Sequence, residues 1–465
     1  MGAIAKAATA PLLLLAAPAF AVSPAVGERE FPTYGYFDPC PVPLVKKAHY
    51  PYCRFDGTSA KASPKKWKTV TLENGNIRVT ATPEIGGKIW GAVDKASGHD
   101  FIYFNDVVKF RDIAMRGPWC SGGIEFNFGV IGHAPWTASP VDWFVRENGD
   151  GSASYFAAGD EYITRAKWQV EVRLQEGADH FETRVDWYNA SGLPSPYYHW
   201  MNAAFPIGEN PSFLFPGSHY SGHGGEIADW PVDPEGRHLD VYRENAFGTA
   251  KSCHVLPGDA SVYGIWWPEL GMGAVHRSEA WEKFGRKIFL WALSREGGIW
   301  EDLLTDSNGQ YAELQSGRYF LQPGWEAHAT PFKHPVLAPG SSERFEESWG
   351  VLRRREDLRE DDPSPVGRPL AAPEGFDWDG AYGLYVRGSQ HFAMGDDLAE
   401  VEWLLNASLA LAPDFAPALD ALAAIEMRRG DYAAVHALCR RALAVSTVDE
   451  DANYLDGYAY FAEGD

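Results

Sequence analysis

The stretch KTVTLENGNIRVTATPEIGGKIWGAV, residues 68–93, decides the fold class of most of this chain. Apolar and polar residues alternate through it in short runs, as they do in half-buried β-strands. Asn74-Gly75 separates the first run from the second and is a dipeptide typical of β-hairpin turns. Gly86-Gly87 separates the second run from the third. The segment therefore predicts three consecutive strands joined by tight turns.

The same pattern continues to residue 352. VDWFVRENGDGSASYFAAG at 141–159 and AKWQVEVRLQEGADHFETRVDWYN at 166–189 are again alternating runs broken by Gly, Asn and Asp. Long helical periodicity is absent, so Glu301 and Asp302 of IWEDLLTD would be charges at a strand end before a turn, unless they belong to a catalytic pair. The prediction is a mainly β chain in which residues 68–352 form a large antiparallel β-sandwich.

Two segments precede this domain. Residues 1–25 carry one positive charge, at Lys6, then an apolar run and an Ala19-Phe20-Ala21 cleavage candidate, and they predict a secretory signal peptide. The apolar run is too short to span a membrane. Residues 26–67 are rich in Pro, Tyr and Lys, and we expect them to form an ordered N-terminal arm. The expected location of the protein is secreted or periplasmic.

The composition changes after residue 352. Residues 353–380 begin with RRREDLREDDPSPVGRPLAAPEG, a charged and Pro-rich linker. Residues 381–465 are dominated by Ala and Leu at helical spacing, and a Gly-Asp pair recurs about every 34 residues, a period typical of tetratricopeptide repeats. Because a repeat cannot bury its apolar face alone, we expect either a truncated array or an open end that docks on something else.

Composition restricts the partners. The formal net charge is −22, so nucleic acid and anionic membranes are poor partners for this surface. Aromatic residues make up 14% of the chain and include 18 Trp, more than a core alone requires. Exposed or cleft-lining rings are therefore expected, with a large aromatic core as the alternative.

Neither the cysteines nor the histidines predict a metal site. Five cysteines are too few for a disulfide scaffold. Cys40 and Cys53 could pair in an oxidising compartment, whereas the others are expected to be buried free thiols. FPGSHYSGHGGE contains His219 and His223 at a spacing that binds zinc on a helix, but its glycines favour a loop whose histidines contact sugar hydroxyls. We expect no metal and no cofactor.

Two strand-like runs each place one ionisable side chain among aromatic and amide groups. SPYYHWMNAAF, residues 195–205, contains His199, and YAELQSGRYFLQPG, residues 311–324, contains Glu313. A histidine and a glutamate can move a proton on and off a sugar ring oxygen. The alternative for His199 is an imidazole hydrogen-bonded inside a packed strand, and for Glu313 a solvated strand face beside Arg318.

Residues 70–352 resemble the galactose-mutarotase-like supersandwich, the fold of aldose 1-epimerases and of several polysaccharide-acting enzymes. The resemblance rests on four segments in consistent order: PEIGGKIWGAV followed by HDFIYFN, RGPWCSGGIEFNFGVIGHAPW, and the two runs that contain His199 and Glu313. With the repeats that follow, the chain resembles a bacterial family of that architecture.

The resemblance implies roles for particular residues. His199 would be the general acid on the ring oxygen and Glu313 the general base, with Asn202 and Gln315 as substrate contacts or supports for them. Further candidates for substrate contact are Asn127, His133, Trp136, Trp200, His219, Glu301 and Arg318.

Glu125 departs from the family pattern. Epimerase-like sequences typically carry an apolar residue or proline after Gly-Gly-Ile, where this chain has Glu125. Mutarotation needs no second carboxylate, but cleavage of a glycosidic bond commonly uses two. We therefore expect an extracytoplasmic carbohydrate-active domain that cleaves a glycosidic bond, with Glu125 paired to Glu313, Glu301 or Asp302.

Two other functions stay open. One is a sugar 1-epimerase in which His199 and Glu313 suffice. The other is a non-catalytic carbohydrate-binding module coupled to a protein-docking repeat array. All three functions have a carbohydrate as the ligand and allow a protein partner at the repeats. None of them involves nucleic acid or a membrane span.

Overall fold

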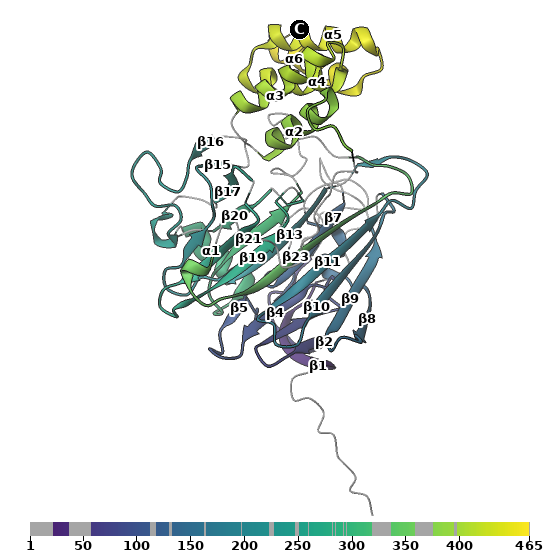
Figure 1. The fold of residues 1–465 in the computed structure, drawn as a ribbon. Coiled ribbons are helices and arrows are strands. Elements are labelled where there is room, and N and C mark those ends of the chain that lie inside the picture. The colour runs from purple at the N-terminus through teal and green to yellow at the C-terminus, as the bar shows by residue number, and fades with distance from the viewer. Residues whose placement is uncertain are drawn as a thin grey trace, which may run out of the picture.

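The structure is a computed structural model. It describes residues 22–36, 57–111, 118–129, 133–161, 164–196, 198–222, 227–246, 251–258, 260, 261–280, 282–283, 285–291, 293, 295–318, 336–358, 375–394 and 398–464. Two large sheets stack face to face, and a group of helices lies beyond one end of them (Figure 1). The predicted fold class is therefore confirmed: the chain is mainly β, with antiparallel sheets followed by helices.

Within the described residues the larger sheet has 13 strands in the order β16-β15-β17-β20-β21-β13-β7-β4-β3-β2-β1-β6, with β5 paired to β4. Its strands are β1 (Ser23–Tyr34), β2 (Ser63–Glu73), β3 (Ile77–Ala81), β4 (Ile89–Asp94), β5 (Asp100–Ile102), β6 (Val108–Lys109), β7 (Ile124–Gly129), β13 (Tyr198–Pro206), β15 (His219–Ser221), β16 (Ile227–Asp229), β17 (Lys251–Leu256), β20 (Lys287–Leu290) and β21 (Tyr311–Gly317). Most neighbouring strands are antiparallel, and the described ends of the expected N-terminal arm are strands of this sheet.

The second sheet has 8 strands in the order β14-β18-β19-β23-β11-β10-β9-β8 among the described residues. They are β8 (Asp142–Glu147), β9 (Ala153–Asp160), β10 (Lys167–Leu174), β11 (His180–Tyr188), β14 (Ser212–Leu214), β18 (Val262–Trp267), β19 (Met272–Ser278) and β23 (Ser342–Leu352). β12 (Ser195–Pro196) pairs separately with β22 (Val336–Leu337). Short 3₁₀ turns are η1 (Pro135–Ala138), η2 (Tyr242–Glu244) and η4 (Arg355–Asp357).

The main core fills the space between the two sheets. Because side chains alternate along a strand, one face of each sheet supplies this core and the other does not. Phe126 and Leu314 of the larger sheet meet Val172 and Trp349 of the second sheet in one apolar cluster. The cysteines at 120, 253 and 439 are buried free thiols, as expected, whereas Cys40 and Cys53 lie outside the described residues.

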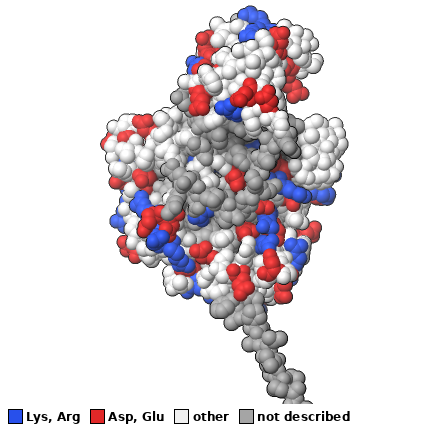
Figure 2. All heavy atoms as spheres, in the orientation of Figure 1, with Lys and Arg blue, Asp and Glu red and all other residues white. Residues whose placement is uncertain are grey.

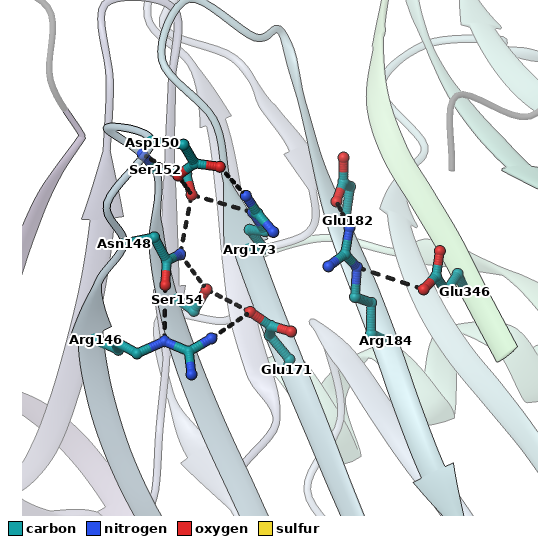
Figure 3. Close-up of polar contacts among 10 residues, drawn as sticks. All are labelled: Arg146, Asn148, Asp150, Ser152, Ser154, Glu171, Arg173, Glu182, Arg184 and Glu346. Carbon is teal, nitrogen blue, oxygen red and sulfur yellow. Dashed lines mark hydrogen bonds and ion pairs between the residues drawn. The ribbon is translucent and has the colours of Figure 1, made fainter. Parts of the chain in front are cut away.

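The outer face of the second sheet is polar. Charged and hydroxyl side chains of β8, β9, β10, β11 and β23 form cross-strand hydrogen bonds and ion pairs there, at the positions that alternate with the core residues (Figure 3). Figure 3 shows two groups of these contacts: one links Arg146, Asn148, Asp150, Ser152, Ser154, Glu171 and Arg173, partly through the turn between β8 and β9, and the other links Glu182, Arg184 and Glu346. On the face of the molecule seen in Figure 2, acidic and basic side chains lie interspersed, and both the β part and the helical part carry them. This face of the sheet is therefore a solvated surface.

One helix interrupts the β region, contrary to the prediction. α1 (Arg295–Thr305) contains Glu301 and Asp302, which were expected at a strand end. Trp300, Leu303 and Leu304 recur at helical spacing and pack against an apolar cluster that includes Tyr311. The helix has only 11 residues. With two glycines in its first turn, its periodicity is too brief to stand out in the sequence.

The C-terminal part is made of helical hairpins. Its helices are α2 (Ala381–Met394), α3 (Leu398–Leu411), α4 (Ala416–Arg429), α5 (Tyr432–Val445) and α6 (Glu450–Glu463). Gly430 ends α4 in the left-handed conformation, and the side chain of Asp431 accepts a hydrogen bond from the Ala434 N–H and so caps α5. The repeated Gly-Asp pair thus makes the turn within a helical hairpin. Gly395-Asp396 lies outside the described residues.

We expect the attachment of α6 to depend on pH, through His436 of α5. Its Nδ1 lies 2.6 Å from Asp456 and its Nε2 lies 3.0 Å from Glu463. Carboxylates only accept hydrogen bonds, so both contacts require the imidazolium. These hydrogen bonds raise the pKa of His436 above its usual value. The resulting stabilisation is complete below about pH 6.5 and is lost as pH rises through the raised pKa.

Hydrogen exchange of the α6 amides across pH 5–9 would measure this. Protection should fall at high pH in the full chain and become independent of pH in His436→Gln. A pH dependence that persists in His436→Gln would assign the effect to other groups.

Candidate functional site

One face of the larger sheet, turned away from the main core, collects polar side chains from four neighbouring strands. Asn202 of β13 lies opposite Glu125 of β7 on one side and opposite Gln315 of β21 on the other. Gln315 in turn lies opposite Lys287 of β20. Directly paired residues point to the same side of a sheet. The side chains that share this site face are Glu125, Asn127, Trp200, Asn202, Lys287, Phe289, Glu313 and Gln315.

Glu125 is the most heavily bonded group on the site face. Its carboxylate accepts hydrogen bonds from Trp119 Nε1 at 2.6 Å and Asn202 Nδ2 at 3.1 Å, and it lies 2.5 Å from His133 Nδ1. Burial raises the pKa of Glu125. The charge and hydrogen bond of His133, the charge of Lys88 and the bond from Asn202 outweigh burial and bring this pKa to about 2. Glu125 is therefore ionised at neutral pH.

The surroundings of Glu313 shift its pKa in the opposite direction from that of Glu125. It is 6% exposed and accepts a hydrogen bond from Gln315 Nε2, at 2.7 Å. Burial raises the pKa of Glu313, and the negative charge of Glu125 raises it further, against the opposing effects of His133, Lys287 and Asn202. Glu313 therefore holds a proton more readily than an ordinary glutamate, close to a carboxylate that is fully ionised.

Two buried lysines and several aromatic rings complete the surroundings. Lys88 Nζ donates to the Cys120 carbonyl at 3.0 Å, and burial lowers its pKa. Burial likewise lowers the pKa of Lys287 to about 8, against the effect of Glu313. Lys287 Nζ lies 5.3 Å from the centre of the Trp200 ring. Lys88 thus lies within electrostatic reach of both carboxyl groups, and Lys287 lies within electrostatic reach of Glu313.

His133 is partly exposed, with 18% of its side chain accessible. Its ring lies edge-on to two indoles, those of Trp119 and Trp200, at centroid distances of 5.4 and 4.9 Å. The indoles and Glu125 together fix the orientation of the imidazole. His133 is therefore placed to meet a ligand from solvent.

A close backbone approach positions Glu125. Gly123 has φ +64°, and a Cβ on it would lie 1.9 Å from the Ile89 carbonyl oxygen. We expect Gly123→Ala to lower the free energy of unfolding by about 2–4 kcal/mol, because it adds a backbone clash to an unfavourable φ. Gly98→Ala is the matched control, since Gly98 has φ +72° with open space around it, and should cost only about 1 kcal/mol. Urea unfolding measures both, and equal losses would contradict the close approach.

The structure brings together seven of the residues predicted for the site. Six of them, Glu125, Asn127, Trp200, Asn202, Glu313 and Gln315, lie on the site face itself. The seventh is His133, which reaches Glu125 from the segment after β7.

The structure does not place His199 on the site face, where the predicted general acid would have to lie. His199 lies three residues before Asn202 on a regular strand, so its side chain points to the other face of the sheet. It is fully buried in the main core, stacks on Phe345 at 4.0 Å and lies 3.3 Å from Lys283 Nζ. Its position agrees with the alternative prediction, in which the imidazole of His199 is packed inside the strand. Arg318 lies on that side too, with Nε 3.1 Å from Glu343.

Three further predicted contacts lie elsewhere. Trp136 is a core residue that stacks against Phe128 and Trp168, and its position in an apolar cluster explains why it is buried. His219 is half exposed on β15 near one edge of the sheet, in a strand instead of the expected loop. Glu301 lies on α1. His223 lies outside the described residues.

Lys88, Lys287 and Trp119 were not predicted as site residues. The two lysines had local signals: Lys88 follows Gly86-Gly87 directly before a buried strand, and Lys287 opens the apolar run KIFL. A lysine at a position that the strand pattern assigns to the interior is rare unless it is paired.

Neither a metal cluster nor a membrane span is found in the described part of the chain. No three His, Cys, Asp or Glu side chains there are grouped as metal ligands. None of the described helices combines the length and apolar character needed to cross a bilayer.

A solved structure shares this architecture, and others match it more weakly. A TPR-domain containing protein from Parabacteroides distasonis ATCC 8503 matches with a TM-score of 0.64 and 20% identity, over 96% of this chain and 78% of that one. A galactose mutarotase-like protein from Lactobacillus casei ATCC 334 matches at 10% identity and TM-score 0.42, over 61% of this chain and 99% of that one. Another galactose mutarotase-like protein, from Clostridium acetobutylicum, matches at 11% identity and TM-score 0.44, over 61% of this chain and 95% of that one.

A family model described as a domain of unknown function, DUF5107, matches residues 45–351. This range includes the whole site face and His133. The chain belongs to the DUF5107 family.

Proposed function

We propose that the β domain binds a sugar over the site face and catalyses proton transfer to and from it. Glu313 would act as the acid, and His133, oriented by Glu125, would act as the base. The observation that carries this proposal is the contrast between two nearby carboxyl groups, because the pKa of Glu125 is held at about 2 while that of Glu313 is raised. Carboxyl groups whose pKa values are driven apart are typical of acid-base sites.

The chemistry follows from the hydrogen bonds. Glu125 accepts from His133 Nδ1, so in the neutral imidazole the proton is on Nδ1 and the lone pair is on Nε2. Nε2 can remove the proton of an anomeric hydroxyl while Glu313 protonates the ring oxygen. The bond from C1 to the ring oxygen then breaks, and a carbonyl forms at C1. Return of both protons after rotation of the carbonyl closes the ring as the other anomer.

The same contrast favours a second candidate, cleavage of a glycosidic bond. A protonated Glu313 could donate to the leaving oxygen, and an ionised Glu125 could act as the second carboxylate. However, Glu125 already accepts from Trp119, His133 and Asn202, and an attack on carbon would have to replace these bonds. Anomer exchange, which leaves Glu125 in place as the support of His133, therefore fits the geometry better.

A glycan and monosaccharide panel followed by NMR tests both candidates on the full chain. Accelerated exchange of the anomers of a free sugar, without new reducing ends, is the expected result. New reducing ends that disappear in Glu125→Gln would establish the glycosidase instead. Saturable sugar binding without either reaction would leave a binding module, and the absence of any binding would overturn the proposal.

An extracytoplasmic location is part of this proposal. It is supported by the leader-like residues 1–25, most of which lie outside the described residues.

A further inference from the structure

Two amide side chains on the site face each keep one buried polar atom without a hydrogen bond. They are Asn127, through Nδ2, and Asn202, through Oδ1, and neither atom has a partner in the chain as the structure describes it. Asn127 is fully buried and Asn202 is 5% exposed. A buried donor or acceptor left unpaired is costly, so two of them side by side need a physical explanation.

The identity of both atoms is fixed by the bonds that their amides already make. Asn127 Oδ1 accepts the backbone N–H of Ala134 at 2.8 Å, so the unpaired atom of Asn127 is the donor Nδ2. Asn202 Nδ2 donates to Glu125, which only accepts, so the unpaired atom of Asn202 is the acceptor Oδ1. The site face thus offers one free donor and one free acceptor.

The two amides are near enough to share one ligand atom. Asn202 pairs with Glu125 and Trp200 pairs with Asn127, which makes Asn127 and Asn202 diagonal neighbours on adjacent antiparallel strands. Such neighbours lie about 7–8 Å apart, somewhat less between their side chains. An oxygen atom that makes two hydrogen bonds of ordinary length spans about 6 Å, and two amide side chains that lean toward each other across this diagonal come within that distance.

We infer that Asn127 and Asn202 form a subsite for one unsubstituted hydroxyl group of the sugar, which accepts a hydrogen bond from Asn127 and donates one to Asn202. This inference rests on the proposed function. A ketone or an ether oxygen can accept but not donate, an ammonium can donate but not accept, and a methylene can do neither. In the free protein, we expect a water molecule to satisfy the same two atoms.

The subsite is linked to the catalytic groups through Asn202. Its amide nitrogen bonds Glu125 while its oxygen faces the subsite, so a hydroxyl bound there and the Glu125–His133 pair share one side chain. A sugar that fills the subsite is thereby positioned next to the base.

Isothermal titration of the full chain with D-galactose and D-glucose, and with their 2-, 3-, 4- and 6-deoxy and amino-deoxy derivatives, tests the inference. Removal of one particular hydroxyl should weaken binding at least about 100-fold, because both amide atoms are then left unpaired. Removal of hydroxyls elsewhere on the ring should have a smaller effect.

Asn127→Asp supplies the decisive variant. The new carboxylate still accepts from Ala134 but replaces the donor by an acceptor, so the subsite then presents two acceptors, which match an ammonium. The preference for hydroxyl over ammonium should invert in Asn127→Asp, at the same ring position that the deoxy series identifies. A merely structural role for Asn127 would weaken all ligands alike and would overturn the inference.

Failure of the subsite differs from failure of the proposed function. If a sugar undergoes exchange but no single hydroxyl dominates its binding, the subsite is wrong and the function stands. If neither sugar binds, a high-resolution crystal structure of the free protein decides. A water bonded to both amides supports a hydroxyl subsite, and its absence contradicts one whether or not the protein is an enzyme.

Discussion

Glu313→Gln should reduce the rate of anomer exchange by about 10²–10⁴-fold, the contribution typical of a positioned acid-base group. Glutamine keeps the size of the side chain and its hydrogen bond with Gln315, but it cannot release a proton. Because Glu313 must be protonated to act as the acid, the wild-type rate should fall as pH rises through its raised pKa.

Glu301→Gln is the matched control for this experiment. Glu301 lies on α1, in the same β domain, and its replacement should leave the rate within about two-fold of wild type. Initial rates of exchange followed by NMR between pH 5 and 9 measure both effects. A full rate in Glu313→Gln, or a pH profile that it shares with the wild type, would remove Glu313 from the chemistry.

Glu347→Gln should lower the free energy of unfolding by about 3–5 kcal/mol. Glu347 is fully buried between the sheets, where it accepts from Ser316 and from His276 Nε2, at 2.9 Å, and lies 3.7 Å from Lys283 Nζ. Burial raises the pKa of Glu347, but these partners outweigh burial and lower it, so the group is ionised. Its neutralisation leaves Lys283 as a buried cation without its counter-charge.

Glu343→Gln on the same strand provides the comparison. Glu343 is partly exposed and pairs with Arg318, so its loss should cost about 1 kcal/mol or less. Urea unfolding followed by tryptophan fluorescence measures the two variants under identical conditions. Similar losses in both would mean that the buried network contributes no more than a partly exposed ion pair.

The sequence predicts the architecture well because the signals it uses are local. The Asn74-Gly75 turn and the alternation around it define β2 and β3, and the Gly-Asp pair at 430–431 is the turn between α4 and α5. The helix α1 was missed because its three turns carry too few apolar positions to compete with the surrounding strand pattern.

The candidate site was predicted only in part, and the reason is geometric. His199 and Asn202 stand in the same run, but three residues on a strand separate opposite faces, so only one of them can reach the site. The alternation rule applied to that run alone would have excluded His199 once Asn202 was placed. The pairing of Glu125 with His133 could not be predicted in this way, because it depends on how the segment after β7 folds back.

The two buried lysines show a second limit of prediction from the sequence. Lys88 and Lys287 are separated by about 200 residues and meet the carboxyl groups only through the order of β4, β7, β13, β21 and β20 in the sheet. No spacing in the sequence encodes that order. The repeats at the C-terminus are the opposite case, since each helix contacts its neighbours in the chain.

The most direct test of the central claim compares His133→Gln with His199→Gln in one assay of anomer exchange on the full chain. The two histidines belong to the same domain, but only His133 lies beside Glu125 on the site face, whereas His199 is stacked in the core. We predict that His133→Gln loses about 10²-fold or more in rate. The folded fraction of His199→Gln should keep nearly the wild-type rate per molecule. Loss of exchange in His199→Gln with full activity in His133→Gln would contradict the site described above.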